Sequence, residues 1–330
     1  MRRIALGLML AGAFASSAVA LPTAYTYQTL DDPSAIASGA TVAYGINDAG
    51  QVTGWFSDGS NVVHAFVYSG GAWTTIDNNP LNGGGGETEG FGINNSGRIT
   101  GAIFDPLGHN ALYDGTSWTL LGNDPNDTSN STDYTGINNS GLMSGIYDSA
   151  TGTQAFLYDG STYATLNNPY DEVTLTVAWG LNNTGEVAGY YRGVLPTPLG
   201  NFISQHGFIF DGATFMGFDA PGADRTQAWD INDAGIVVGT YIDALSQHHW
   251  FLYDGTTFSD LDLPYDPATV LITGINDADQ LVGRYAGANG EHGFIATPKS
   301  VPEPSTFTMF AMALALLGWR ARTTQHRSVI

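Results

Sequence analysis

One segment of this chain occurs six times. The sequence YGINDAGQVTGWF at residues 44–56 returns as FGINNSGRITGAI, TGINNSGLMSGIY, WGLNNTGEVAGYY, WDINDAGIVVGTY and TGINDADQLVGRY. The units are anchored on Asn47, Asn94, Asn138, Asn182, Asn232 and Asn276. Spacings of 44 to 50 residues are typical of propellers and solenoids, in which one small unit repeats. No stretch between the two end segments repeats apolar residues at helical spacing, so we expect an all-β fold.

The residue pattern of each unit predicts four short antiparallel strands joined by tight turns. The first strand ends at the asparagine, and the residue three positions on needs positive φ; it is glycine in five units and Asp279 in the sixth. The third and fourth strands form a hairpin, and four of these hairpins carry an Asp-Gly turn pair. The second strand holds a glycine in every unit, which we expect to admit the ring two residues later, such as Phe56 in the first unit. These glycines are Gly54, Gly101, Gly145, Gly189, Gly239 and Gly283.

The ends of the repeat region favour a closed ring over an open solenoid. The sixth unit stops after its third strand, HGFIATP at 292–298, while the segment YTYQTLDDP at 25–33 resembles a fourth strand without a sheet. If this N-terminal strand completes the sixth sheet, the two ends of the domain are fastened together. We therefore predict that residues 21–298 form a monomeric six-bladed β-propeller of four-stranded antiparallel blades, closed in this way.

The first 20 residues read as an export signal. Arg2 and Arg3 precede a short apolar run, and small residues at Ala18 and Ala20 form a cleavage site after position 20. A first transmembrane helix is the alternative, but the apolar run is shorter than the roughly 20 residues that a span requires.

The last segment, residues 299–330, has three parts. The triplet Pro302-Glu303-Pro304 precedes an apolar run at 307–319, and the basic residues Arg320 and Arg322 follow. This order resembles the PEP-CTERM sorting signal, which implies an exported protein at the envelope, surface or extracellular matrix of a Gram-negative-type bacterium, with exosortase as the partner of the tail. A plain membrane anchor is the alternative. Because 13 helical residues reach only about 20 Å, the tail would hold a membrane transiently.

The charge distribution excludes some partners. Six of the ten basic residues lie in the end segments, which leaves four arginines in residues 21–298, where all but one of the 31 carboxylates lie. A nucleic acid is therefore not expected as a partner. There is no cysteine, so the exported domain has neither a disulfide nor thiol chemistry.

A histidine opens the third strand in five units. His64, with Ala65 and Phe66, spells the signature of the HAF-type extracellular repeat, which the units resemble; that resemblance implies a secreted or surface-displayed protein and supplies no catalytic residues. Third strands of neighbouring blades lie too far apart for these histidines to share an ion. We expect each to make a local hydrogen bond to neighbouring backbone. The set is His64, His109, His206, His249 and His292, with Gln154 in the third unit.

No motif identifies a cofactor or a catalytic residue. The repeated Asn-Asn and Asn-Asp steps read as Asx turns rather than as glycosylation sites. The oxygen-rich loop at 124–133 is the one candidate for Ca²⁺, although it lacks the spacing of an EF-hand. G-x-S-x-G, HExxH and Walker patterns are absent from the sequence.

Length variation between units falls on the connections from second to third strand, the longest being 192–205, and between blades. These emerge on one face, where scaffold folds carry specificity. Ligand contacts are expected there from Glu87, Glu89, Asp133, Arg192 and Arg225.

We predict a non-enzymatic surface protein that binds an extracellular polysaccharide or a protein through this face. The alternatives are a polysaccharide-cleaving hydrolase or lyase that uses loop carboxylates, and a spacer that binds nothing.

Overall fold

The structure is a computed structural model that describes residues 21–299 apart from 36–39, 78–85, 105–107, 170–174 and 198–199. These residues form strands and turns, and no helix occurs among them. The predicted signal peptide with Ala18 and Ala20, and the sorting tail from residue 300 onward, lie outside the described residues. Within the described ranges, no helix is long and apolar enough to cross a membrane.

The strands follow the predicted fourfold pattern in each unit. The first unit holds β2 (Thr41–Ile46), β3 (Val52–Ser57), β4 (Val63–Ser69) and β5 (Ala72–Thr75). The second holds β6 (Glu87–Ile93), β7 (Ile99–Phe104), β8 (His109–Tyr113) and β9 (Trp118–Leu120). The third holds β10 (Asp133–Ile137), β11 (Met143–Ser149), β12 (Gly152–Tyr158) and β13 (Tyr163–Thr165). The fourth holds β14 (Leu175–Leu181), β15 (Val187–Thr197), β16 (Gly200–Phe210) and β17 (Phe215–Phe218). The fifth holds β18 (Ala223–Ile231), β19 (Val237–Asp243), β20 (His248–Tyr253) and β21 (Phe258–Asp260). The sixth holds β22 (Leu271–Ile275), β23 (Leu281–Gly287) and β24 (Gly290–Pro298), and β1 (Tyr25–Leu30) lies beside them.

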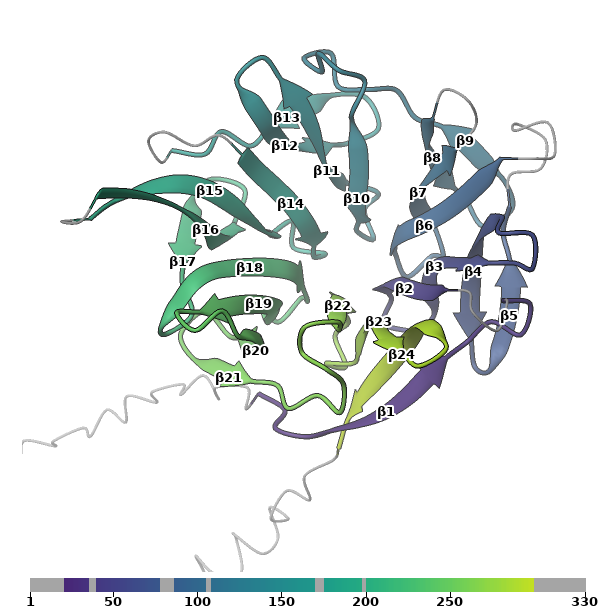
Figure 1. The fold of residues 1–330 in the computed structure, drawn as a ribbon. Coiled ribbons are helices and arrows are strands. Elements are labelled where there is room, and N and C mark those ends of the chain that lie inside the picture. The colour runs from purple at the N-terminus through teal and green to yellow at the C-terminus, as the bar shows by residue number, and fades with distance from the viewer. Residues whose placement is uncertain are drawn as a thin grey trace, which may run out of the picture.

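The units are arranged around a common axis, with the first strand of each unit innermost (Figure 1). Four units form separate four-stranded sheets. The third and fourth units are joined into one eight-stranded sheet by a single parallel pair, Thr153 with Leu175. Within every unit the pairing is antiparallel, as predicted.

The N-terminal strand pairs as predicted. β1 lies antiparallel to β24, with a register that runs from Tyr25 opposite Pro298 to Leu30 opposite Gly293. The sixth sheet therefore has the order β1-β24-β23-β22 and contains both ends of the repeat region (Figure 1).

Six apolar clusters fill the spaces between successive units of the described domain. One of them joins the sixth unit to the first, because it contains Val282 and Ile295 together with Val52 and Phe66. Strands with apolar residues on both faces are buried by such stacking, so each unit depends on its neighbours for stability.

In four units the ring beside the second-strand glycine differs from the prediction in its origin. A Cβ on Gly239 would overlap Phe251, which lies opposite it on the third strand, rather than a ring two residues later. Gly145, Gly189 and Gly283 face a third-strand phenylalanine in the same way. The reason is register: the third-strand phenylalanine is the direct cross-strand partner of the glycine.

We expect Gly239→Ala to lower the free energy of unfolding by about 1–3 kcal/mol, because the added methyl overlaps both the Phe251 ring and the Gln227 carbonyl oxygen. Urea unfolding measures this change. Gly122→Ala is the matched control, since its nearest neighbour would be the Tyr163 hydroxyl at 3.8 Å. Equal losses in the two variants would contradict the packing argument.

The longest second-to-third connection was expected as a loop and is instead a strand extension. Residues 192–197 of β15 pair with residues 200–205 of β16, from Arg192 opposite Gln205 to Thr197 opposite Gly200. In Figure 1 this hairpin projects outward from the fourth unit.

Candidate functional site

Each innermost strand carries an irregularity just before its asparagine. The register with the second strand shifts between Ala43 and Gly45 in the first unit, and at the matching place in the other five. A bulge leaves its extra residue unpaired and redirects the side chain. The residues so placed line the cavity on the axis: Tyr44, Phe91, Thr135, Trp179, Trp229 and Thr273.

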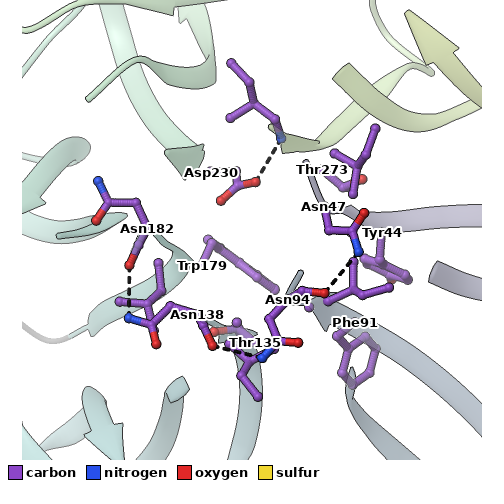
Figure 2. Close-up of a pocket in the computed structure, with 18 of the residues that line it drawn as sticks. Tyr44, Asn47, Phe91, Asn94, Thr135, Asn138, Trp179, Asn182, Asp230 and Thr273 are labelled. Carbon is purple, nitrogen blue, oxygen red and sulfur yellow. Dashed lines mark hydrogen bonds between the residues drawn. The ribbon is translucent and has the colours of Figure 1, made fainter. Parts of the chain in front are cut away.

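This axial cavity has a volume of about 500 Å³ and is bounded by all six units. Figure 2 shows side chains from several innermost strands converging on it. Tyr44 meets Phe91 edge to face with ring centroids 5.3 Å apart, and Trp179 lies 5.3 Å from Trp229. The volume falls within the roughly 300–1,000 Å³ of small-molecule sites, and such sites combine aromatic walls with a few polar groups.

The asparagines form a hydrogen-bonded ring at one end of the cavity (Figure 2). Each Oδ1 accepts from its own turn, as in Ala49 N to Asn47 Oδ1 at 3.1 Å, which confirms the predicted Asx turns. Each Nδ2 also donates to the asparagine carbonyl of the next unit. The last of these bonds runs from Asn276 to the carbonyl of Asn47, at 3.0 Å.

A second ring lies one residue further along each turn and is exposed. Each backbone N–H donates to the side-chain Oδ1 of the equivalent residue in the next unit, at 2.7–3.0 Å. Desolvation and the adjacent carboxylates of Asp48 and Asp233 raise the pKa of Asp277 to about 6. The six residues are Asp48, Asn95, Asn139, Asn183, Asp233 and Asp277.

Carboxylates also stand at the opposite end of the cavity, where the innermost strands begin. Glu89 and Asp133 line this mouth, with the exposed ring of Phe104. Burial, followed by the charges of Glu87 and Asp133, raises the pKa of Glu89 to about 7. Partial burial and the charges of Asp127 and Asp148 likewise raise the pKa of Asp133. Glu89 therefore takes up a proton near neutral pH, and a mouth lined by carboxylates disfavours anions.

Three of the five predicted ligand contacts thus come together. Glu87, Glu89 and Asp133 interact electrostatically at the mouth. Arg192 on β15 and Arg225 on β18 are exposed and are not among the cavity-lining residues. The aromatic lining was not predicted, although its residues are the first letters of the six repeated segments.

Four of the five histidines pair with carboxylates, so for these four the predicted backbone partner is wrong. Nδ1 of His64 lies 2.6 Å from Asp77, that of His206 lies 2.9 Å from Asp219, and that of His292 lies 2.8 Å from Asp31. His249 uses Nε2 to reach Asp243 at 3.1 Å. The first three pairs tie the third strand to the end of the fourth, which is why a carboxylate is available at the same place in different units.

No metal centre can be assigned from these groups. Among the described residues, no three His, Asp or Glu side chains are placed to hold an ion together. In the predicted calcium loop, Asp127 accepts hydrogen bonds from the backbone of Ser131 at 2.9 Å and of Thr132 at 2.7 Å. Calcium binding at 124–133 stays a prediction.

Residues 300–322 match the PEP-CTERM protein-sorting motif, a match that covers Pro302, Glu303, Pro304, Arg320 and Arg322. This motif indicates an exported protein of a Gram-negative-type bacterium whose tail is recognised by exosortase. Among curated protein sequences, none is detectably similar to this chain.

Several solved structures are similar in fold. A six-bladed β-propeller lectin from Aleuria aurantia, described with a fucose recognition mode, is 11% identical with a TM-score of 0.46, covering 82% of this chain and 99% of its own. A Trypanosoma rangeli sialidase is 10% identical with a TM-score of 0.48, covering 89% and 58%. A gluconolactonase from Xanthomonas campestris is 14% identical with a TM-score of 0.47, covering 79% and 87%. At these identities no residue's role can be carried over.

Proposed function

We propose that this chain is an exported surface protein whose domain is a closed six-bladed β-propeller, and that it binds a saccharide of the extracellular matrix in its axial cavity without transforming it. Exosortase acts on the tail. The observation that carries the binding proposal is the cavity itself, in which bulged aromatic residues and carboxylates from all six units face one space.

Ring closure is supported by three independent contacts between the ends of the domain. β1 pairs with β24, Asn276 donates to the carbonyl of Asn47, and Asp31 pairs with His292. Each joins residues more than 200 positions apart.

Saccharide chemistry fits the cavity wall. A pyranose ring has apolar C–H faces, which pack on aromatic rings such as Trp179 and Tyr44, and hydroxyl edges, which donate to carboxylates. Glu89 and Asp133 stand at the mouth, where the variable connections also emerge. Arg192 and Arg225, on the same side of the domain, would contact a longer chain or a protein partner.

We expect Glu89→Gln combined with Asp133→Asn to weaken saccharide binding about tenfold or more, because each carboxylate accepts hydrogen bonds from hydroxyls. Binding of the exported protein to a glycan array identifies ligands, and calorimetry measures the change. Asp224→Asn, which removes an exposed carboxylate outside the cavity, is the control. A cavity variant that binds as well as the wild type would contradict the proposal.

One observation favours the enzyme alternative: a glutamate with a pKa near 7 beside a second carboxylate is suited to act as a general acid on a glycosidic bond. An enzyme would release products from a polysaccharide panel, and Glu89→Gln would eliminate that release. A binding protein retains the intact polysaccharide. If the protein binds no saccharide and captures no partner in pull-downs from native matrix, the domain is a spacer that binds nothing.

A further inference from the structure

Asp230 interrupts the pattern of the cavity wall. Two residues before the asparagine, five units have glycine, and the fifth unit has Asp230. The other residues at this position are Gly45, Gly92, Gly136, Gly180 and Gly274. Asp230 lines the cavity in Figure 2, and the neighbouring strand makes room for it, because a Cβ on Gly180 would lie 2.5 Å from its Oδ1.

The carboxylate of Asp230 is held in place by backbone donors only. Its Oδ1 accepts from the N–H of Ile231 at 2.9 Å and its Oδ2 from the N–H of Ile275 at 2.8 Å. Desolvation outweighs these bonds and raises the pKa of Asp230 to about 7. A carboxylate in this position is costly to ionise unless a cation joins it.

Arg284 acts electrostatically on Tyr44 but is paired with Glu291, so it is not a free counter-ion for the cavity. The described lining of the cavity contains no lysine, arginine or histidine. The other titratable carboxylates of the lining are Asp48, Glu89, Asp133, Asp233 and Asp277. All of them favour a positively charged ligand over an anionic one.

Two tryptophans adjoin Asp230. Trp229 precedes it on β18, and Trp179 lies 5.3 Å from Trp229 between centroids, with 36° between the ring planes. The face of an indole attracts ammonium groups, most strongly where water is excluded. Two indoles and one oriented carboxylate are therefore complementary to an organic cation.

We propose that the saccharide bound in the axial cavity is an amino sugar with a free, protonated amine, whose ammonium group pairs with Asp230 beside Trp179 and Trp229. This rests on the proposed saccharide-binding function and narrows it to one ligand class. N-acetylation would remove the charge and leave Asp230 without its counter-ion.

The test compares glucosamine oligomers with N-acetylglucosamine oligomers of the same length, which differ in the charge of the nitrogen. Calorimetry at pH 7 with the exported protein is expected to give affinities about tenfold to hundredfold higher for the free amines. Asp230→Asn should reduce this preference to less than about threefold. Asp224→Asn on the same strand should keep it.

Equal affinity for the two oligomers, or preference for the N-acetylated one, would overturn the amino-sugar inference and leave saccharide binding intact. Failure of the wild type to bind any saccharide on an array would overturn both. The wild-type comparison needs no variant, so the inference can fail even if Asp230→Asn does not fold. Asp230→Gly, which copies the other five units, is the second variant and should also abolish the preference.

Discussion

Deleting residues 21–31 is expected to lower the free energy of unfolding by on the order of 5 kcal/mol, most of what a domain has. The deletion removes β1, with the fully buried Leu30 and with Tyr25, from the sixth sheet. Truncating a buried leucine alone costs about 2–5 kcal/mol. In a domain of this size, the melting temperature should fall by about 10–20 °C. Thermal unfolding followed by circular dichroism measures it.

The loss of stability should result from the loss of the pairing between β1 and β24. A synthetic peptide of residues 21–33 added to the deleted protein can restore the strand along the edge of β24, so it should raise the melting temperature, whereas a scrambled peptide should not. As point variants, Leu30→Ala should be strongly destabilising, and Leu245→Ala, whose side chain is 78% exposed, nearly neutral. A deletion variant that melts like the wild type would show that the domain does not depend on β1.

The pairing of β1 with the sixth sheet could be predicted because the evidence for it is local in the sequence. The sixth unit lacks a strand, and the spare strand at the other end has the same pattern of residues. The turns were predictable for the same reason: Asp279 takes a φ of 55°, where the other units have a glycine in the left-handed region.

The asparagine ring was missed because an Asx turn explained the residue too easily. An aspartate would cap such a turn equally well, yet all six positions are asparagine. Only an amide can donate to the next unit, and that donation is what the structure adds. One position later the side-chain oxygen accepts in every unit, so Asp48 and Asn95 are both found there, although the amide of Asn95 also donates to Asp48.

The cavity lining was missed for a different reason. Alternation along a strand predicts which residues share a face, but a bulge shifts that alternation by one residue. The bulge before each asparagine therefore turns Tyr44 and Trp179 toward the axis. Their variation between units, beside an unvarying turn, was the available signal.

The pH dependence of stability should follow from the same cavity. The pKa of Asp230 is raised to about 7 and that of Glu89 to about 7, above the roughly 3.9 and 4.3 of unfolded chains. Between these limits the folded state binds more protons than the unfolded state, so the free energy of unfolding falls as pH rises from about 4 to 7. It then levels off.

Asp230 and Glu89 should contribute comparable parts of this slope, because a shift of about three pKa units corresponds to at most about 4 kcal/mol for each, and water in the cavity reduces that figure. The hairpin carboxylates act elsewhere: hydrogen bonds from Ser117 and Thr116 lower the pKa of Asp114 to about 2, so its contribution is lost only below about pH 4. Urea unfolding at intervals between pH 4.5 and 8.5 separates the two effects.

Asp230→Gly is expected to reduce the slope by roughly half, because Glu89 still contributes, and Asp224→Asn to leave it unchanged, because Asp224 is exposed on the same strand. A profile that rises between pH 5 and 7, or one that Asp230→Gly does not alter, would contradict the assignment of part of the slope to this carboxylate. Since an ammonium ligand would compensate the charge of Asp230, glucosamine oligomers should stabilise the protein more than N-acetylglucosamine oligomers do at pH 7. The cavity thus links the protonation of one side chain, the stability of the ring of sheets and the class of ligand that it admits.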